Sequence, residues 1–202
     1  MCSLIEKCRC RTVSLQYVLQ KTVTFHLRNI SRIRRFLTQS ACNNAIRSLV
    51  LSRLDYCNGL LSTIPVTQLY RIQRLQNWAA RLIYQVTRSH SPKPLLDSLH
   101  WLPVRHRIVF KLLLLVFKSL NKQAPQYLRD CLTLYTPRRT IRASSDPLRL
   151  TYNITRKLAG DRTFTITASK YWNRLPLILR QSPSVSSLKK GLKTFLFCNS
   201  DF

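Results

Sequence analysis

The sequence predicts a mainly all-α fold, and two observations support this expectation. Over several segments the apolar residues recur every three or four positions while Arg and Lys occupy the other side, which is the pattern of amphipathic helices. Prolines stand directly before four apolar segments, at positions typical of a first helical turn: "STIPVTQLYRI", "HWLPVRH", "QAPQYLRDCL" and "RLPLILR". With 202 residues and 45% hydrophobic content, the chain can bury a core as one domain or two small ones.

The first predicted helix spans residues 26–37, and residues 1–20 form an N-terminal extension to which no element is assigned. The apolar side of this helix consists of Leu27, Ile30, Ile33 and Leu37, and its basic side consists of Arg28, Arg32 and Arg35. A second helix is predicted over residues 40–55 and ends near Gly59, which can adopt a left-handed conformation. Its apolar positions are Ala45, Ile46, Leu49, Val50 and Leu54.

A third helix opens at Pro65 and separates its two faces more clearly than the others. Its apolar stripe consists of Leu69, Ile72, Leu75, Ala79, Leu82, Ile83 and Val86. A basic stripe lies roughly opposite and consists of Arg71, Arg74, Arg81 and Arg88. The three helices together predict an N-terminal helical unit over residues 21–90, and the Pro- and Ser-containing segment at residues 88–94 is its predicted boundary.

The second predicted unit spans residues 91–202 and is also helical. Pro103 begins a helix that runs to about Leu120 and is apolar on nearly all sides, with one cationic stripe formed by Arg107, Lys111 and Lys118. We expect one short β pairing around residues 148–154 and a last helix over residues 184–197. Trp101 and Trp172 each precede a Leu-Pro pair, which indicates that an aromatic side chain anchors the chain where a helix begins.

The charge of the chain predicts a polyanionic partner. Lys and Arg number 34 against 7 Asp and Glu, which gives a formal net charge of +27. Arg outnumbers Lys 23 to 11, and its planar guanidinium favours nucleic acid over lipid. The predicted nucleic-acid-binding residues are Arg28, Arg32, Arg35, Arg71, Arg74, Arg81, Arg88, Arg107, Lys111 and Lys118. Candidates for stacking on bases are Tyr70, Trp78 and Tyr84, for which core packing is the competing role.

Several kinds of chemistry are excluded or disfavoured by the residues present. Three glycines cannot form a Gly-rich phosphate loop, and the seven acidic residues include no adjacent pair for a two-metal centre. His100, His106 and Asp97 could form an acid–base or metal site, but we interpret them as polar residues at a helix entrance. We therefore expect no catalytic activity, cofactor, metal or small-molecule substrate.

The most apolar run and the cysteines indicate where in the cell the protein is expected. The most apolar run, residues 108–117, is too short to span a membrane. Seven scattered cysteines without a signal segment indicate a reducing compartment, either nucleus or cytoplasm, and a protein that is not secreted.

Seven segments follow one another in a recognisable order: "HLRNISRIRRFLT", "SRLDYCNGLLSTIP", "LQNWAARLI", "LHWLPVRHRIVFKLLLLVFKSLN", "APQYLRDCLTLYTPRRTIRASS", "GDRTFTITASKYWNRLPLILR" and "SVSSLKKGLKTFLF". Together they resemble the C-terminal part of the reverse transcriptase polyprotein of LINE-type non-LTR retrotransposons, most closely the jockey-like and chicken-repeat-like kinds. The likeness covers about residues 21–197. It implies a thumb-like helical unit followed by a C-terminal helical region, both downstream of the polymerase palm that bears the catalytic aspartates.

The resemblance implies that the chain is a fragment that lacks the palm and the endonuclease domain and cannot polymerise. It implies RNA or an RNA–DNA hybrid as the partner, and the missing polymerase domains as a second partner. The alternative is a structural or non-functional remnant whose apolar faces would pack on the absent palm.

Overall fold

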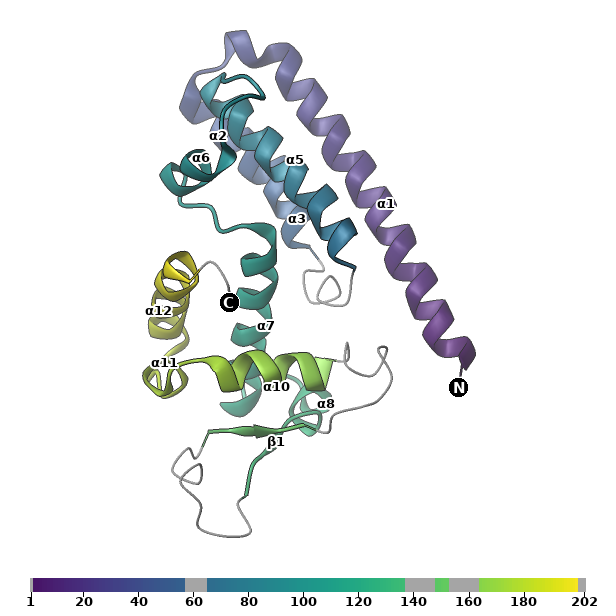
Figure 1. The fold of residues 1–202 in the computed structure, drawn as a ribbon, viewed down its shortest axis with the longest axis vertical. Coiled ribbons are helices and arrows are strands. Elements are labelled where there is room, and N and C mark those ends of the chain that lie inside the picture. Colours follow the sequence, from purple (N-terminus) through teal and green to yellow (C-terminus); the bar gives the residue numbers. More distant parts are fainter. Residues whose placement is uncertain (1, 57–64, 137–147, 153–163, 200–202) are drawn as a thin grey trace. The chain divides into compact units, whose positions relative to one another are not determined.

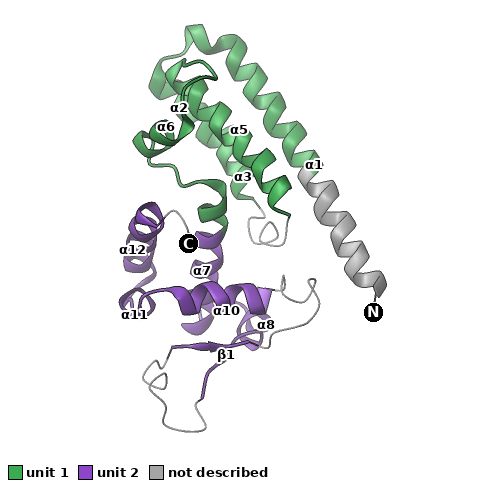
Figure 2. Cartoon of the chain, in the orientation of Figure 1, with its two compact units in different colours: residues 1–108 green, residues 109–202 purple. Residues whose placement is uncertain are grey.

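The computed structural model describes residues 2–56, 65–136, 148–152 and 164–199, with the backbone alone over residues 2–16. It is mainly helical, which confirms the predicted fold class (Figure 1). The chain divides into two compact units, residues 1–108 and 109–202 (Figure 2). The expected boundary at residues 88–94 lies inside the first unit, because α6 (Pro92–Ser98) packs against α5 (Val66–Tyr84).

In the first unit, α1 lies alongside α5 (Figure 1). The elements before α5 are α1 (Cys2–Ile33), the 3-10 turn η1 (Arg34–Phe36), α2 (Gln39–Ile46), the π-type turn η2 (Arg47–Leu51) and α3 (Ser52–Asp55). The stretch from α2 to α3 confirms the helix predicted over residues 40–55. Helix α1 is much longer than the predicted residues 26–37 and includes the extension that had no assignment. No proline or glycine precedes Gly59, so no residue of this segment breaks a helix.

The core of the first unit contains most of the predicted apolar residues. Fully buried side chains from four elements include Leu27, Ile46, Val50, Ile72 and Ala79. The prediction of burial is wrong for two residues, because Ile33 is 49% exposed and Leu49 is 39% exposed. Ile33 is the last residue of α1, where the chain turns into η1. Leu49 lies in η2, where the wider π-type turn shifts the apolar phase by one residue and buries Leu51 instead.

Prolines stand at the start of α5, α8 (Gln126–Asp130) and α11 (Leu177–Arg180), as predicted, but each is the residue before the first helical residue. Pro65, Pro125 and Pro176 have extended backbones with ψ of 148°, 149° and 144°, and each caps the helix that follows. The Pro65 carbonyl accepts bonds from Gln68 and Leu69 at 3.0 and 3.2 Å. Each of these three prolines therefore starts its helix through its carbonyl, and its missing N–H leaves no donor unpaired.

The "HWLP" stretch fixes the start of α7 (Val104–Leu120) within the first unit. His100 has a left-handed backbone with φ of 53°, and Trp101 after it is buried. Buried Gln76 on α5 donates from Nε2 to the Leu102 carbonyl at 2.9 Å. One turn earlier, the Oε1 of Gln73 accepts from the Val104 N–H at 2.8 Å. This stretch is thus the entrance to a helix, as the sequence indicated.

The second unit contains the larger part of α7, α8 (Gln126–Asp130), α10 (Phe164–Arg174), α11 (Leu177–Arg180) and α12 (Val185–Cys198). Strand β1 (Thr133–Leu134) pairs antiparallel with β2 (Leu150–Thr151), which confirms the β pairing expected in this region. Part of the predicted range, residues 153–154, lies outside the described residues.

Trp172 anchors the second unit, as predicted from its place before Leu-Pro. Its buried indole donates from Nε1 to the Leu148 carbonyl at 2.8 Å. The neighbouring Asn173 side chain pairs with both backbone groups of Leu150, at 2.9 and 2.8 Å. The last predicted helix, residues 184–197, is α12, and the Ser184 hydroxyl caps it by accepting from the Ser187 N–H at 3.1 Å.

Candidate nucleic-acid interface

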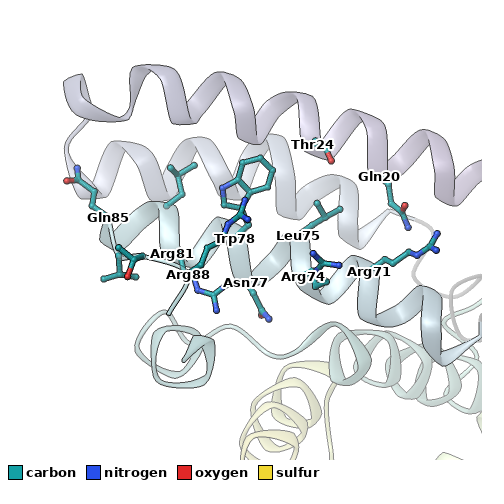
Figure 3. A pocket seen from close by; sticks show the side chains of 13 residues that line it. Gln20, Thr24, Arg71, Arg74, Leu75, Asn77, Trp78, Arg81, Gln85 and Arg88 are labelled. Carbon is teal, nitrogen blue, oxygen red and sulfur yellow. The ribbon is translucent and has the colours of Figure 1, made fainter. Parts of the chain in front are cut away.

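A groove of about 730 Å³ runs between α1 and α5 in the first unit (Figure 3). Gln20 and Thr24 line it from α1, and the other residues come from α5 and the turn after it. We call it the α1–α5 groove. Its lining residues are Gln20, Thr24, Arg71, Arg74, Leu75, Asn77, Trp78, Arg81, Leu82, Gln85, Val86, Thr87 and Arg88. All four arginines of the basic stripe predicted for the third helix are among them, and none of the thirteen described lining residues is acidic.

The helical period of α5 places these arginines along one side. Arg71, Arg74 and Arg81 share that side, while Ile72, Ala79 and Ile83 are buried on the other. The helix ends earlier than the stripe predicted, because Gln85 takes a left-handed conformation with φ of 55°. Arg88 therefore lies in the following turn rather than on the helix, yet it still lines the groove.

The four arginines differ in how they are held. Arg71, Arg74 and Arg88 are exposed at the groove, where their guanidinium groups face solvent. Arg81 is half-buried and donates from Nε and Nη2 to the His90 carbonyl, at 3.2 and 3.0 Å. Arg81 therefore also holds the turn after α5, whereas the other three arginines are more exposed.

The three stacking candidates lie in different surroundings. Half-buried Trp78 lines the groove, and its ring lies between the two helices (Figure 3). Tyr84 packs against the core, and its hydroxyl is 2.8 Å from the Ser98 Oγ. Tyr70 is 67% exposed on α5, but it is not among the groove-lining residues.

A second depression, of about 430 Å³, lies along α1 and contains two arginines of the first predicted stripe. Arg28 and Arg32 line it together with Lys21. Gln20 and Thr24 line both this depression and the α1–α5 groove, so basic residues of two helices lie on one continuous surface.

The remaining predicted residues line neither the groove nor the depression along α1. Arg35 is exposed on η1, with its guanidinium 4.7 Å from the centre of the Phe36 ring. Arg107 forms a two-pronged ion pair with Asp55, in which its Nε donates to Oδ1 at 2.9 Å and its Nη2 to Oδ2. The pair matches the Arg107 charge and ties α7 to α3. Lys111 is exposed and Lys118 is half-buried, and both belong to the second unit.

Arg34, which was not among the predicted residues, has a structural role that its position in the sequence does not reveal. Arg34 is only 9% exposed, and its guanidinium donates to the carbonyls of Leu82, Leu37 and Ile83 at 2.8, 2.7 and 2.7 Å. Two of these carbonyls belong to the last turn of α5, where a positive charge is favourable.

Burial raises the pKa of the Cys42 thiol above its usual value, and the nearby Arg34 charge offsets part of this rise.

The groups considered for acid–base or metal chemistry differ in burial. His100 and Asp97 are exposed, whereas His106 is buried. Within the described ranges, no three His, Cys, Asp or Glu side chains come together to hold a metal ion. No helix in this part of the chain is long and apolar enough to cross a membrane.

Comparison with family models, curated proteins and solved structures finds no match to this chain.

Proposed function

We propose that the chain binds nucleic acid, either RNA or an RNA–DNA hybrid, through the α1–α5 groove and without sequence preference. The observation that supports this most strongly is the set of four arginines on a groove whose described lining contains no carboxylate. A surface with so many unmatched positive charges repels itself until a polyanion neutralises it.

The chemistry of the groove suits a sugar–phosphate backbone. Exposed Arg71, Arg74 and Arg88 offer forked N–H donors to phosphate oxygens. Gln20 and Asn77 add amide donors and acceptors of the kind that contact phosphate and sugar without reading sequence. Binding of this kind releases counterions, so its affinity falls steeply as salt rises.

We further infer that the chain is a catalytically inactive fragment of a LINE-type reverse transcriptase polyprotein. The ordered motifs over residues 21–197 support this, together with the isolated positions of the acidic residues in the sequence. The first unit then corresponds to the thumb, whose task is to hold template or hybrid, and the chain acts in the nucleus or cytoplasm.

A second candidate is a structural remnant whose exposed apolar residues would pack on a polymerase palm. Val66 on α5 is 64% exposed and Ile178 on α11 is 84% exposed, and these are apolar side chains that such a partner would cover. The two candidates differ in solution, because a remnant with uncovered apolar faces would aggregate and the proposed binder would be a monodisperse helical monomer.

The test is a salt series on the full chain with a labelled RNA strand and a labelled RNA–DNA duplex. A variant with Arg71, Arg74 and Arg88 changed to Gln removes three charges from the groove and leaves the turn-holding Arg81 in place. The matched control changes three exposed arginines of the first unit that do not line the groove, Arg47, Arg53 and Arg105.

On the duplex, the groove variant should reduce the slope of log K against log salt by up to about 0.9 for each lost phosphate contact. The control should keep nearly the parental slope. Equal loss in both variants would show that binding is diffuse and that the groove is not the site.

A further inference from the structure

We propose that the outer side of α1 is a stacking site for unpaired bases of a single-stranded nucleic acid. Its residues are Tyr17, Lys21, Phe25, Arg28 and Arg32, which we call the aromatic–basic face of α1. This inference rests on the proposed function, because it gives the same surface a second kind of contact. The residues before Lys21 had no predicted role in the sequence.

The face is defined by helical spacing. Its residues follow one another at intervals of four, four, three and four, which places all five on one side of a helix. At about 100° per residue, they lie roughly opposite the buried positions Val23, Leu27 and Ile30. The core of the unit therefore uses the other side of α1, and packing does not explain the aromatic residues here.

Both aromatic side chains are largely in solvent. Tyr17 is 58% and Phe25 is 59% exposed, and both line the depression along α1. The Lys21 ammonium lies over one face of the Tyr17 ring, so a flat partner would stack on the other face of Tyr17 and on the exposed ring of Phe25. Eight residues separate them, which is about 12 Å along the helix axis. This is several times the spacing of about 3.4 Å between stacked bases, so each ring would hold a different nucleotide of one strand.

The charges on this face select an anionic partner. The Lys21 ammonium is 4.4 Å from the centre of the Tyr17 ring, and Arg28 and Arg32 follow Phe25 along the helix. None of the described residues lining the depression is acidic. Alternating rings and cations match a single strand, whose bases stack on aromatic side chains while its phosphates meet the cations.

Two other partners fit less well. A membrane-surface helix separates an apolar side from a basic side, but the apolar side of α1 is already buried in the core. A duplex hides its base faces by pairing and stacking, so it could use the cations but not the rings. The shared residues Gln20 and Thr24 connect this face to the α1–α5 groove, so one strand could contact both surfaces.

The test changes both rings to leucine, Tyr17→Leu with Phe25→Leu, which keeps apolar side chains and good helix formers on α1. The control changes two exposed aromatics that have no proposed role in binding, Tyr56→Leu with Tyr127→Leu. The probes are a labelled oligouridine of about 12 nucleotides, an abasic strand of the same length, and an RNA–DNA duplex. Helical content by circular dichroism verifies that each variant is folded.

The Tyr17 and Phe25 variant should bind oligouridine about tenfold more weakly or worse, with an unchanged salt slope. Its affinity for the abasic strand and for the duplex should stay at the parental value, as should all affinities of the control. Equal oligouridine affinity in variant and parent would overturn the stacking site. So would release of the variant from anionic phospholipid vesicles with oligonucleotide binding intact, since that would make this face a membrane surface.

The outcomes separate this inference from the proposed function. If the groove variant lowers the duplex salt slope but the ring variant binds oligouridine normally, only the stacking site is wrong. If the parental chain binds none of the three probes, both proposals are wrong.

Discussion

Replacement of Arg34 by alanine is expected to destabilise the first unit strongly, although the protein contains 23 arginines and most described ones are exposed. The change removes one cation that serves three backbone carbonyls, those of Leu37, Leu82 and Ile83. Two of them end α5, so the loss frays the last turn of the helix that forms one wall of the groove.

The magnitude follows from the number of bonds and the burial of the side chain. A hydrogen bond to a charged group contributes about 1.5–3 kcal/mol, so three independent bonds would give about 4.5–9 kcal/mol. The three share one guanidinium and the carbonyls can partly rehydrate, so we expect a loss of about 3–5 kcal/mol in the free energy of unfolding.

The matched control is the next residue, Arg35, which is exposed on the same 3-10 turn. Arg35→Ala should change the free energy of unfolding by less than about 0.5 kcal/mol. Urea titration followed by far-ultraviolet circular dichroism measures both variants, with stability compared at equal m-value. If Arg34→Ala and Arg35→Ala unfold at the same urea concentration, the structural role assigned to Arg34 is refuted.

Three further predictions concern other parts of the fold. Cys42 is buried, and burial raises the pKa of its thiol, so it should react with a thiol reagent at pH 8 far more slowly than exposed Cys131 and Cys198. Mass spectrometry locates the labelled cysteines, and comparable labelling of all three would contradict the burial of Cys42. Gln76→Leu leaves the Leu102 carbonyl without its amide donor and should cost about 1–3 kcal/mol in urea unfolding, whereas exposed Gln39→Leu should cost little. Asn173→Ala leaves both backbone groups of Leu150 unpaired and should speed hydrogen exchange of the Leu150 amide by tenfold or more, and unchanged exchange would show that this side chain does not hold β2.

Much of the fold could be predicted because the helices are amphipathic and begin at prolines. Helix α5 shows this best, since Ile72 and Ala79 are buried and Arg71 and Arg74 are exposed, as their spacing predicts. The start of α7 was also predictable, because Trp101 and Pro103 mark it in the sequence.

What could not be predicted depends on contacts between distant residues. The π-type turn η2 changes which residues face the core, and no local pattern indicates it. Arg34 and Arg35 are adjacent and chemically identical, yet one is buried by carbonyls about fifty positions away and the other is not. The basic stripe of α5 was predictable, but its companion wall was not, because Gln20 and Thr24 are neither basic nor apolar and so belong to neither kind of stripe.

Lys21, which lines the depression along α1, was not among the predicted residues, although the sequence contains a signal for it. Its spacing of seven and eleven residues from Arg28 and Arg32 continues the basic side of the first predicted helix toward the N-terminus. Extending the helix by two turns would have included it. The ion pair of Arg107 with Asp55 had no such signal, because it joins positions 52 residues apart that no local spacing connects.

The most direct test of the central claim is photo-crosslinking of the full chain to an RNA–DNA hybrid, with the crosslinked peptides located by mass spectrometry. Binding in the α1–α5 groove predicts crosslinks concentrated in residues 71–88, which include Trp78 at the groove. Crosslinks confined to residues 109–202 would contradict it, because the bound nucleic acid would then lie on the second unit.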